Sequence, residues 1–283
     1  MTVQVSIVIP VFNNIEYLAA CIDSAVQQRS VKVEIICVDD ASTDGSADLL
    51  DEISRSNSNV HVLRNTRNSG PGASRNKGLI MAGGKFVRFA DADDLLPPDS
   101  SALLYEKAVK ESVDLVRGSL AIFQGDCPSK VVRAITQPNR NRTFFSEEKP
   151  LWIPWWHTSY LISNTLIREN QLRYPDLRRG EDPVFMAKVL LRSRSIALIE
   201  DVVYLYRSYQ KSTGTGSATF EDLLASLKHA EIVKDLYLSV NKTYWEDGYG
   251  PFLKENTQNL IKRCNLKPDQ QSTAESELDR IWS

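Results

Sequence analysis

Residues 5–14 read VSIVIPVFNN, an apolar run rich in β-branched residues that ends in two asparagines. Similar runs recur through the first ninety residues and alternate with stretches whose apolar residues are spaced as in a helix. This alternation predicts an α/β fold, with a mostly parallel sheet flanked by crossover helices. The predicted strands are Val3–Val11, Val33–Val38, Val60–Arg64 and Lys85–Phe89, and the predicted helices are Ile15–Gln28, Gly45–Ser54 and Gly72–Ala82.

Polar residues follow each of the four predicted strands. In an α/β sheet of this kind, ligands bind at the carboxyl ends of the strands. We therefore expect one polar cleft, built from the segments Pro10–Asn14, Asp39–Ser42, Asn65–Gly72 and Asp91–Asp94.

The amino-acid composition limits the classes of protein to which this chain can belong. The chain has 283 residues, 42% of them hydrophobic, which suffices for one large α/β domain with an appended piece. Its 34 basic and 36 acidic residues are spread along the chain, so we expect no nucleic-acid partner. The four cysteines lie far apart, which favours reduced thiols. The N-terminal run lacks the basic leader of a signal peptide, so the expected location is the cytoplasm.

An Asp91-x-Asp93 pair follows the strand predicted at Lys85–Phe89. Paired carboxylates hold hard divalent cations, which also bridge the phosphates of a substrate. A turn or capping role is the alternative, and the position opposite Asp39 and Asp40 favours the metal. A carboxylate at Asp39 or Asp40 can accept a hydrogen bond from a uracil imide or a ribose hydroxyl, with helix capping as the alternative.

The segment Asn65–Asn76 contains glycines and two arginines ahead of a predicted helix. Helix N-termini and arginines both suit phosphate, although an ordinary glycine-containing loop is the alternative. The segment lacks the ending of a Walker-type phosphate loop. No G-x-G-x-x-G follows the first strand either, which disfavours a dinucleotide oxidoreductase.

Together these segments resemble the inverting glycosyltransferases of family 2, which have the Rossmann-like GT-A fold of nucleotide-diphospho-sugar transferases. They stand in that family's order and spacing over about the first two hundred residues. The matching segments are VSIVIPVFN at 5–13, VDDASTDGS at 38–46, Asn68-x-Gly70 with ASRNKG at 73–78, FADADD at 89–94 and GED at 180–182.

The resemblance implies a UDP-sugar donor and a Mn²⁺ or Mg²⁺ ion. Asp40 would line the nucleobase pocket, Asp91 would contact the ribose side, and Asp93 would coordinate the metal with Asp91. The expected donor-binding residues in these segments are Pro10, Phe12, Asp39, Asp40, Asn68, Gly70, Arg75, Asp91, Ala92 and Asp93.

Asp182 would be the general base, with Glu181 beside it helping to hold the acceptor hydroxyl. A direct displacement needs a carboxylate opposite the leaving group and no covalent nucleophile, which agrees with this role. Capping of the helix predicted at Pro183–Arg192 is the alternative for Asp182. In this family a later segment often closes over the diphosphate, and Tyr206–Gly214 stands at that place.

Arg207 and Lys211 in that segment would neutralise the leaving group, although an ordinary basic loop is equally consistent. Acceptor contacts are expected from an aromatic cluster before a strand predicted at Tyr160–Ile167, because aromatic faces stack on sugars. Packing in the core is the alternative for its tryptophans. The expected acceptor-binding residues are Trp155, Trp156, His157 and Glu181.

The predicted organisation is a glycosyltransferase domain at 1–217 followed by a helical extension at 218–283. The domain divides into a nucleotide-binding half at 1–123 and an acceptor-side half at 124–217, which starts with a long, polar excursion at 124–150. Helices are expected at Ala218–Val240, Pro251–Cys264 and Thr273–Trp282. Dimerisation and peripheral contact with the inner face of the membrane are left open for the extension.

The predicted function is metal-dependent, inverting transfer of a hexose or N-acetylhexosamine from a UDP-sugar to a hydroxyl of a glycan or lipid-linked glycan, in bacterial surface polysaccharide synthesis. A non-catalytic nucleotide-sugar or glycan-binding module is one alternative. A nucleotidyltransferase is the other, although Phe12-Asn13-Asn14 does not supply the glycine- and lysine-rich loop that such enzymes need after the first strand.

Overall fold

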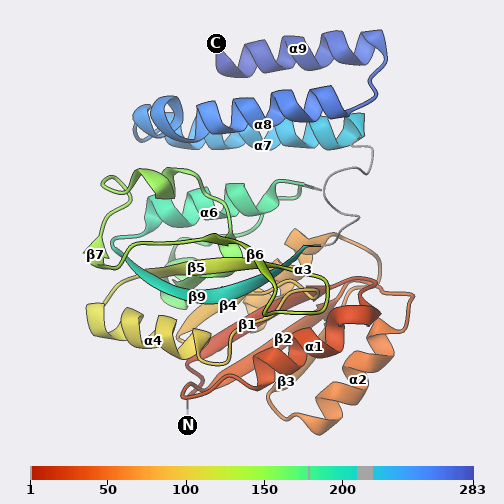
Figure 1. Ribbon diagram of the computed structural model, residues 1–283, viewed down its shortest axis with the longest axis vertical. Coiled ribbons are helices and arrows are strands. Elements are labelled where there is room, and N and C mark those ends of the chain that lie inside the picture. Colours follow the sequence, from red (N-terminus) through yellow and green to blue (C-terminus); the bar gives the residue numbers. More distant parts are fainter. Residues whose placement is uncertain (1, 178, 209–218) are drawn as a thin grey trace.

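The computed structural model describes residues 2–177, 179–208 and 219–283 and confirms the α/β class (Figure 1). One sheet runs through the described residues in the order β3-β2-β1-β4-β8-β5-β9-β7, with β6 pairing β5. The strands are β1 Val5–Val11, β2 Val33–Asp39, β3 Val60–Arg64, β4 Phe86–Phe89, β5 Leu115–Gln124, β6 Val131–Ile135, β7 Arg140–Thr143, β8 Tyr160–Ser163 and β9 Ile196–Ser208. The half made of β3, β2, β1 and β4 is entirely parallel, as the sequence predicts.

Helices cover both faces of this sheet. They are α1 Ile15–Val26, α2 Ser46–Ser56, α3 Pro71–Met81, α4 Ser100–Glu111, α5 Asn164–Glu169, α6 Glu181–Arg192, α7 Phe220–Leu238, α8 Gly250–Arg263 and α9 Pro268–Trp282. Alternate residues of β1 face opposite cores, because successive side chains of a strand point to opposite faces. Val5, Ile7 and Ile9 pack in the cluster that includes α1 and α4, whereas Val8 packs in the cluster that includes α3 and α6.

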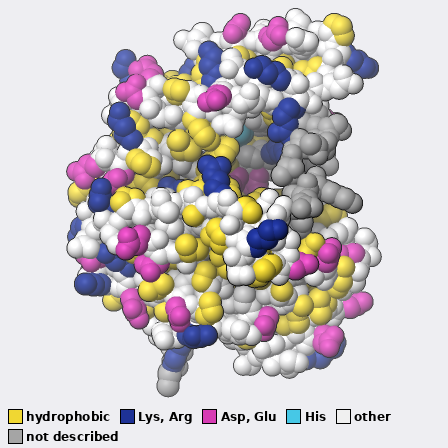
Figure 2. Space-filling model, viewed as in Figure 1, with side chains coloured by type: hydrophobic (Ala, Val, Ile, Leu, Met, Phe, Trp, Pro, Cys, Tyr) yellow, Lys and Arg dark blue, Asp and Glu magenta, His cyan; other side chains and the backbone are white. Residues whose placement is uncertain are grey.

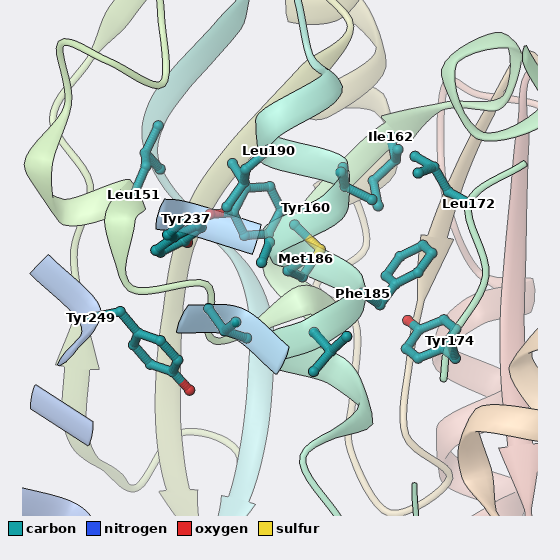
Figure 3. Packing of buried hydrophobic residues seen from close by; sticks show 14 of the residues in the cluster. Leu151, Tyr160, Ile162, Leu172, Tyr174, Phe185, Met186, Leu190, Tyr237 and Tyr249 are labelled. Atoms are coloured by element: carbon teal, nitrogen blue, oxygen red, sulfur yellow. The ribbon is translucent and has the colours of Figure 1, made fainter. Parts of the chain in front are cut away.

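The C-terminal helices extend the second of these cores. In Figure 1, α6 lies between the sheet and α7 with α8, and α9 lies outermost. Buried residues of α6, such as Phe185 and Met186, share one cluster with Tyr237 of α7 and Tyr249 of the short π-helix Trp245–Tyr249 (Figure 3). The predicted helices at 218–283 are therefore present and pack on the sheet through α6. The boundary predicted at 217/218 lies outside the described residues.

The structure corrects two predictions about local structure. The strand expected at Tyr160–Ile167 ends at Ser163, because the Ser163 hydroxyl accepts a hydrogen bond from the Leu166 amide (3.4 Å) and caps α5. The excursion at 124–150 contains β6, which the strand-like run at 131–135 indicates, and also β7, which the sequence analysis does not predict. β7 has exposed polar residues and pairs with β9 at the edge of the sheet, so it shows no buried alternation.

Candidate active site

A pocket of about 310 Å³ opens at the carboxyl ends of the parallel strands. It brings together most of the predicted donor-binding residues. Asp39 and Arg207 are absent from its lining, and Lys211 lies outside the described residues. The lining residues are Pro10, Val11, Phe12, Asn14, Asp40, Asn68, Gly70, Pro71, Ser74, Arg75, Asp91, Ala92, Asp93 and Tyr206.

Asp40 shapes one wall of this pocket. Its carboxylate accepts hydrogen bonds from the amides of Ser69 (2.9 Å) and Gly70 (2.7 Å) and from the side chain of Asn65 (2.7 Å). These bonds draw the segment before α3 against the end of β2, which brings the N-terminus of α3 to the pocket. Helix N-termini favour anions, and here the Asp40 carboxylate is the anion at the N-terminus of α3. Asp39 instead lies buried and accepts a bond from the Ser42 amide (3.2 Å).

Residues of strand β9 form hydrogen bonds with Asp91–Asp94, the acidic turn that follows β4. The Tyr204 hydroxyl donates to Asp94 Oδ2 (2.7 Å) and accepts from the Asp91 amide (3.0 Å). Arg207 is buried; its Nε donates to the Asp93 carbonyl (2.7 Å), and its guanidinium lies over the Tyr17 ring. The structure thus places Arg207 in a strand behind the turn, although the sequence analysis expects it in a closing loop over the diphosphate.

The acidic turn concentrates negative charge at the pocket. Burial raises the pKa of Asp94 well above its ordinary value, and the nearby charges of Asp91 and Asp93 raise it further. A divalent cation would relieve this repulsion, and carboxylate oxygens are its preferred ligands. The residues therefore fit a hard cation that completes its coordination with phosphate oxygens. In the described parts of the chain, no cluster of three or more His, Cys, Asp or Glu side chains forms an all-protein metal site.

Arg75 joins this pocket to the predicted catalytic pair. Its guanidinium donates to Asp91 Oδ1 (2.7 Å) on the donor side and to Glu181 Oε1 (3.0 Å) at the start of α6. The Arg75 side chain is only 5% exposed and lies 5.3 Å from the Tyr174 ring centroid. Buried ion pairs with such geometry fix orientation strongly, because moving one partner leaves a charge unpaired.

Asp182 and Glu181 occupy the first turn of α6. Gly180 is the N-cap and the helix has no side-chain cap, so Asp182 does not cap α6. Asp182 Oδ2 lies 3.2 Å from His157 Nδ1. Burial acts to raise the pKa of Asp182, but the hydrogen bond with His157 and the charges of His157 and Arg75 outweigh it, so the pKa is lowered. Burial raises the pKa of Glu181, and Arg75 only partly opposes this effect. The surroundings therefore favour the ionised form more strongly for Asp182 than for Glu181.

The aromatic residues expected at the acceptor side divide into two groups. Trp152 is buried and its indole donates to the Phe145 carbonyl (2.8 Å), so it belongs to the core. Trp155 and Trp156 are half-buried, and Trp156 packs edge-on against Tyr206 at the pocket, with ring centroids 5.6 Å apart. His157 is buried beneath Asp182. Figure 2 shows the surface hollowed between the C-terminal helices and the sheet, with acidic side chains inside the hollow.

The fold and the site define a GT-A type α/β protein. A crystal structure of TarS 1–349 from Staphylococcus aureus in complex with UDP-GlcNAc matches 99% of this chain and 89% of that chain, with a TM-score of 0.67 and 18% identity. The mannosyltransferase PcManGT from Pyrobaculum calidifontis, in complex with GDP-Man and Mn²⁺, matches 99% of this chain and 75% of that chain, with a TM-score of 0.62 and 16% identity. These two likenesses show the fold.

The chain belongs to glycosyl transferase family 2, whose model matches residues 6–171. The poly(ribitol-phosphate) beta-glucosyltransferase of Bacillus spizizenii is 32% identical over 207 residues, which cover 72% of this chain and 32% of that protein. Glycosyltransferase GlyG of Streptococcus pneumoniae is 26% identical over 220 residues, which cover 73% of this chain and 71% of that protein. The chain thus spans about a third of the first relative.

Proposed function

We propose that this chain is an inverting hexosyltransferase that transfers a sugar from a UDP-sugar to a hydroxyl group of a glycan. One observation carries the proposal. Buried Arg75 bonds to Asp91 in the nucleotide-sized pocket and to Glu181 beside Asp182, so the donor and catalytic groups form one connected site. A pocket for a nucleotide alone would not need this link.

In this mechanism the donor lies in the pocket with its base near Asp40 and its diphosphate near Asp91 and Asp93. Asp91 and Asp93 would hold Mn²⁺ or Mg²⁺, which supplies positive charge for the departing diphosphate. Asp182 accepts the proton of the acceptor hydroxyl while that oxygen attacks the anomeric carbon, which is a single displacement with inversion. Glu181 keeps Arg75 oriented, and the chain supplies no covalent nucleophile to the reaction.

The acceptor class is proposed from the relatives. Two of them are named for poly(ribitol-phosphate): the Bacillus spizizenii enzyme, and the Staphylococcus aureus TarS, which is 25% identical over 224 residues. We propose a bacterial surface polysaccharide, free or lipid-linked, as the acceptor, with poly(ribitol phosphate) the first to test. In the described parts of the chain, no helix is both long and apolar enough to cross a membrane. Peripheral membrane contact and dimerisation stay predictions.

The test is nucleotide-diphosphate release from UDP-, GDP- and dTDP-sugars, with Mn²⁺ or chelator, with and without poly(ribitol phosphate). We expect metal-dependent release from a UDP-sugar and its loss in Asp93→Ala. Asp201→Ala, which removes an exposed carboxylate outside the pocket lining, is the matched control. Nucleotide binding without release from any sugar would support the binding-module alternative, and absence of both would refute the proposal.

A further inference from the structure

The C-terminal helices reach the first turn of α6, where Asp182 lies. His229 of α7 is buried and packs directly on Gly180, the N-cap of α6. Gly180 has φ +80°, and a Cβ atom there would lie 2.4 Å from His229 Nδ1. A side chain at position 180 would therefore be strained by its backbone and would collide with His229. His229 of α7 can lie against the start of α6 only because position 180 carries no side chain.

A hydrogen-bonded chain continues from His229 to the acceptor side. His229 Nε2 lies 3.2 Å from the Tyr249 hydroxyl, and that hydroxyl lies 3.0 Å from Trp155 Nε1. An indole N–H only donates, so the Tyr249 oxygen accepts from Trp155. Its single hydrogen can then point to His229 Nε2, in the tautomer that leaves this nitrogen unprotonated. Burial lowers the pKa of His229 to about 4, which keeps the ring neutral and leaves one ring nitrogen able to accept.

The chain spans segments that are far apart in the sequence. Trp155 and Tyr249 are separated by 94 positions, and both are part of the cluster that contains the buried face of α6. Figure 3 shows Tyr249 and Tyr237 beside the side chains of α6. Among the described residues, the Tyr249 hydroxyl connects Trp155 to His229. The Tyr237 hydroxyl instead donates to the Trp152 carbonyl (3.1 Å) in the core.

We propose that Tyr249 and His229 are positioning residues of the acceptor side, and that the C-terminal extension is a working part of the active site. Through them the extension fixes Trp155 at one edge of the acceptor region and Gly180, with Asp182 two residues on, at the other. This inference rests on the proposed function for the role of Asp182. The link itself rests on contacts among described residues and can be tested without any turnover.

The experiment compares Tyr249→Phe with Tyr237→Phe. Each variant removes one buried hydroxyl from a tyrosine that is 0% exposed, so the two are matched in volume and burial. Amide hydrogen exchange is measured over 155–159 and 180–184, which leaves out the amide next to the Trp152 carbonyl that Tyr237 bonds. Hydrolysis of UDP-GlcNAc and UDP-glucose with Mn²⁺, in which water is the acceptor, is measured for the native chain and both variants.

We expect faster exchange at both segments in Tyr249→Phe only. In the same variant kcat for donor hydrolysis should fall about tenfold, while KM for the UDP-sugar stays within about twofold. His229→Gln, whose amide oxygen can accept the Tyr249 hydrogen, should retain more hydrolysis than His229→Leu. A general loss of stability would lower kcat equally in Tyr237→Phe, so the pair separates positioning from a structural role.

The outcomes distinguish this inference from the proposed function. Equal behaviour of Tyr249→Phe and Tyr237→Phe in exchange and in kcat overturns the positioning role, even when the native chain is active. A change of exchange confined to Tyr249→Phe supports the link between the extension and the two segments. If the native chain also hydrolyses no donor, that result counts against the proposed function and leaves the link standing.

Discussion

The donor side and the acceptor side of the pocket are built in different ways. The proposed donor side is made mainly at the ends of parallel strands within the first 94 residues, with Tyr206 of β9 in its lining. Asp40 organises it through bonds to a segment about thirty positions away. The acceptor side joins three distant parts of the chain, at 155–157, 180–182 and 229–249. The family model ends at residue 171, before two of these parts. The proposed donor side therefore lies mostly within the segment that matches the family model, whereas the proposed acceptor side also uses residues beyond it.

The largest effect is expected where the acceptor side does its chemistry. Asp182→Asn removes the carboxylate that we propose as the proton acceptor, so transfer should fall about 10³-fold or more. The donor pocket is intact in this variant, so calorimetric binding of UDP with Mn²⁺ should be unchanged. Asp176→Asn, an exposed carboxylate in the segment before α6, is the control. Retained transfer in Asp182→Asn would mean that another group is the base.

The next effect is expected at the link between the two sides. Lysine is a point charge and cannot reproduce the two bonds that Arg75 makes to Asp91 and Glu181, so Arg75→Lys should lower kcat about 100-fold. Arg117→Lys changes another buried arginine outside the pocket lining and controls for lost packing. Steady-state kinetics and thermal melts of both variants are the measurement. If Arg75→Lys only melts earlier, without loss of kcat beyond the control, the two sides are independent.

The contrast between the donor side and the acceptor side explains which features of the molecule the sequence predicts. The first four strands, the first three helices and most of the pocket lining follow from local patterns, because apolar runs set strand ends and strand ends converge at one edge. The acidic turn is predictable for the same reason. The sequence analysis assigns no role to Asp94 or Tyr204, although Asp94 stands inside a matching segment. The bond between them joins residues 110 positions apart, so no spacing in the sequence indicates it.

The acceptor side was harder to predict because its contacts are set by tertiary packing. Trp152 and Trp155 look alike as members of one aromatic cluster, yet the first lies in the core and the second bonds to Tyr249. His229 carries no local signal, since one histidine on a helix is usual in a core. Gly180, which has a left-handed backbone in the structure, is the one local signal near His229. The GED segment explains this glycine equally well, so the sequence does not indicate His229 as its neighbour.

A smaller effect is expected from Asp40→Asn, which tests whether the bonds of Asp40 organise the donor side of the pocket. In this variant the side-chain NH₂ group would face a backbone N–H that now donates to a carboxylate oxygen of Asp40. We therefore expect a loss of about 3 kcal/mol in the free energy of unfolding and about tenfold weaker UDP binding. Denaturant unfolding and calorimetry measure these changes. Asp39→Asn, which keeps an acceptor oxygen for the Ser42 amide, should change UDP binding less. Equal weakening in both variants would contradict the separate role of Asp40.

The smallest effect is a pH dependence of the free energy of unfolding, which comes from His229 on the acceptor side. The pKa of His229 is lowered from 6.5 to about 4 in the folded chain, because burial disfavours its charged form. Between these values the unfolded chain takes up a proton that the folded chain does not, so stability falls as the pH falls through this window. From pH 7 to pH 5 the free energy of unfolding should drop by about 1 to 2 kcal/mol more in the native chain than in His229→Gln. Asp182 faces His229 in both chains, so its own titration cancels in the difference. Urea unfolding at the two pH values measures the drop, and equal slopes would show that His229 is protonated as readily in the folded chain as in the unfolded one.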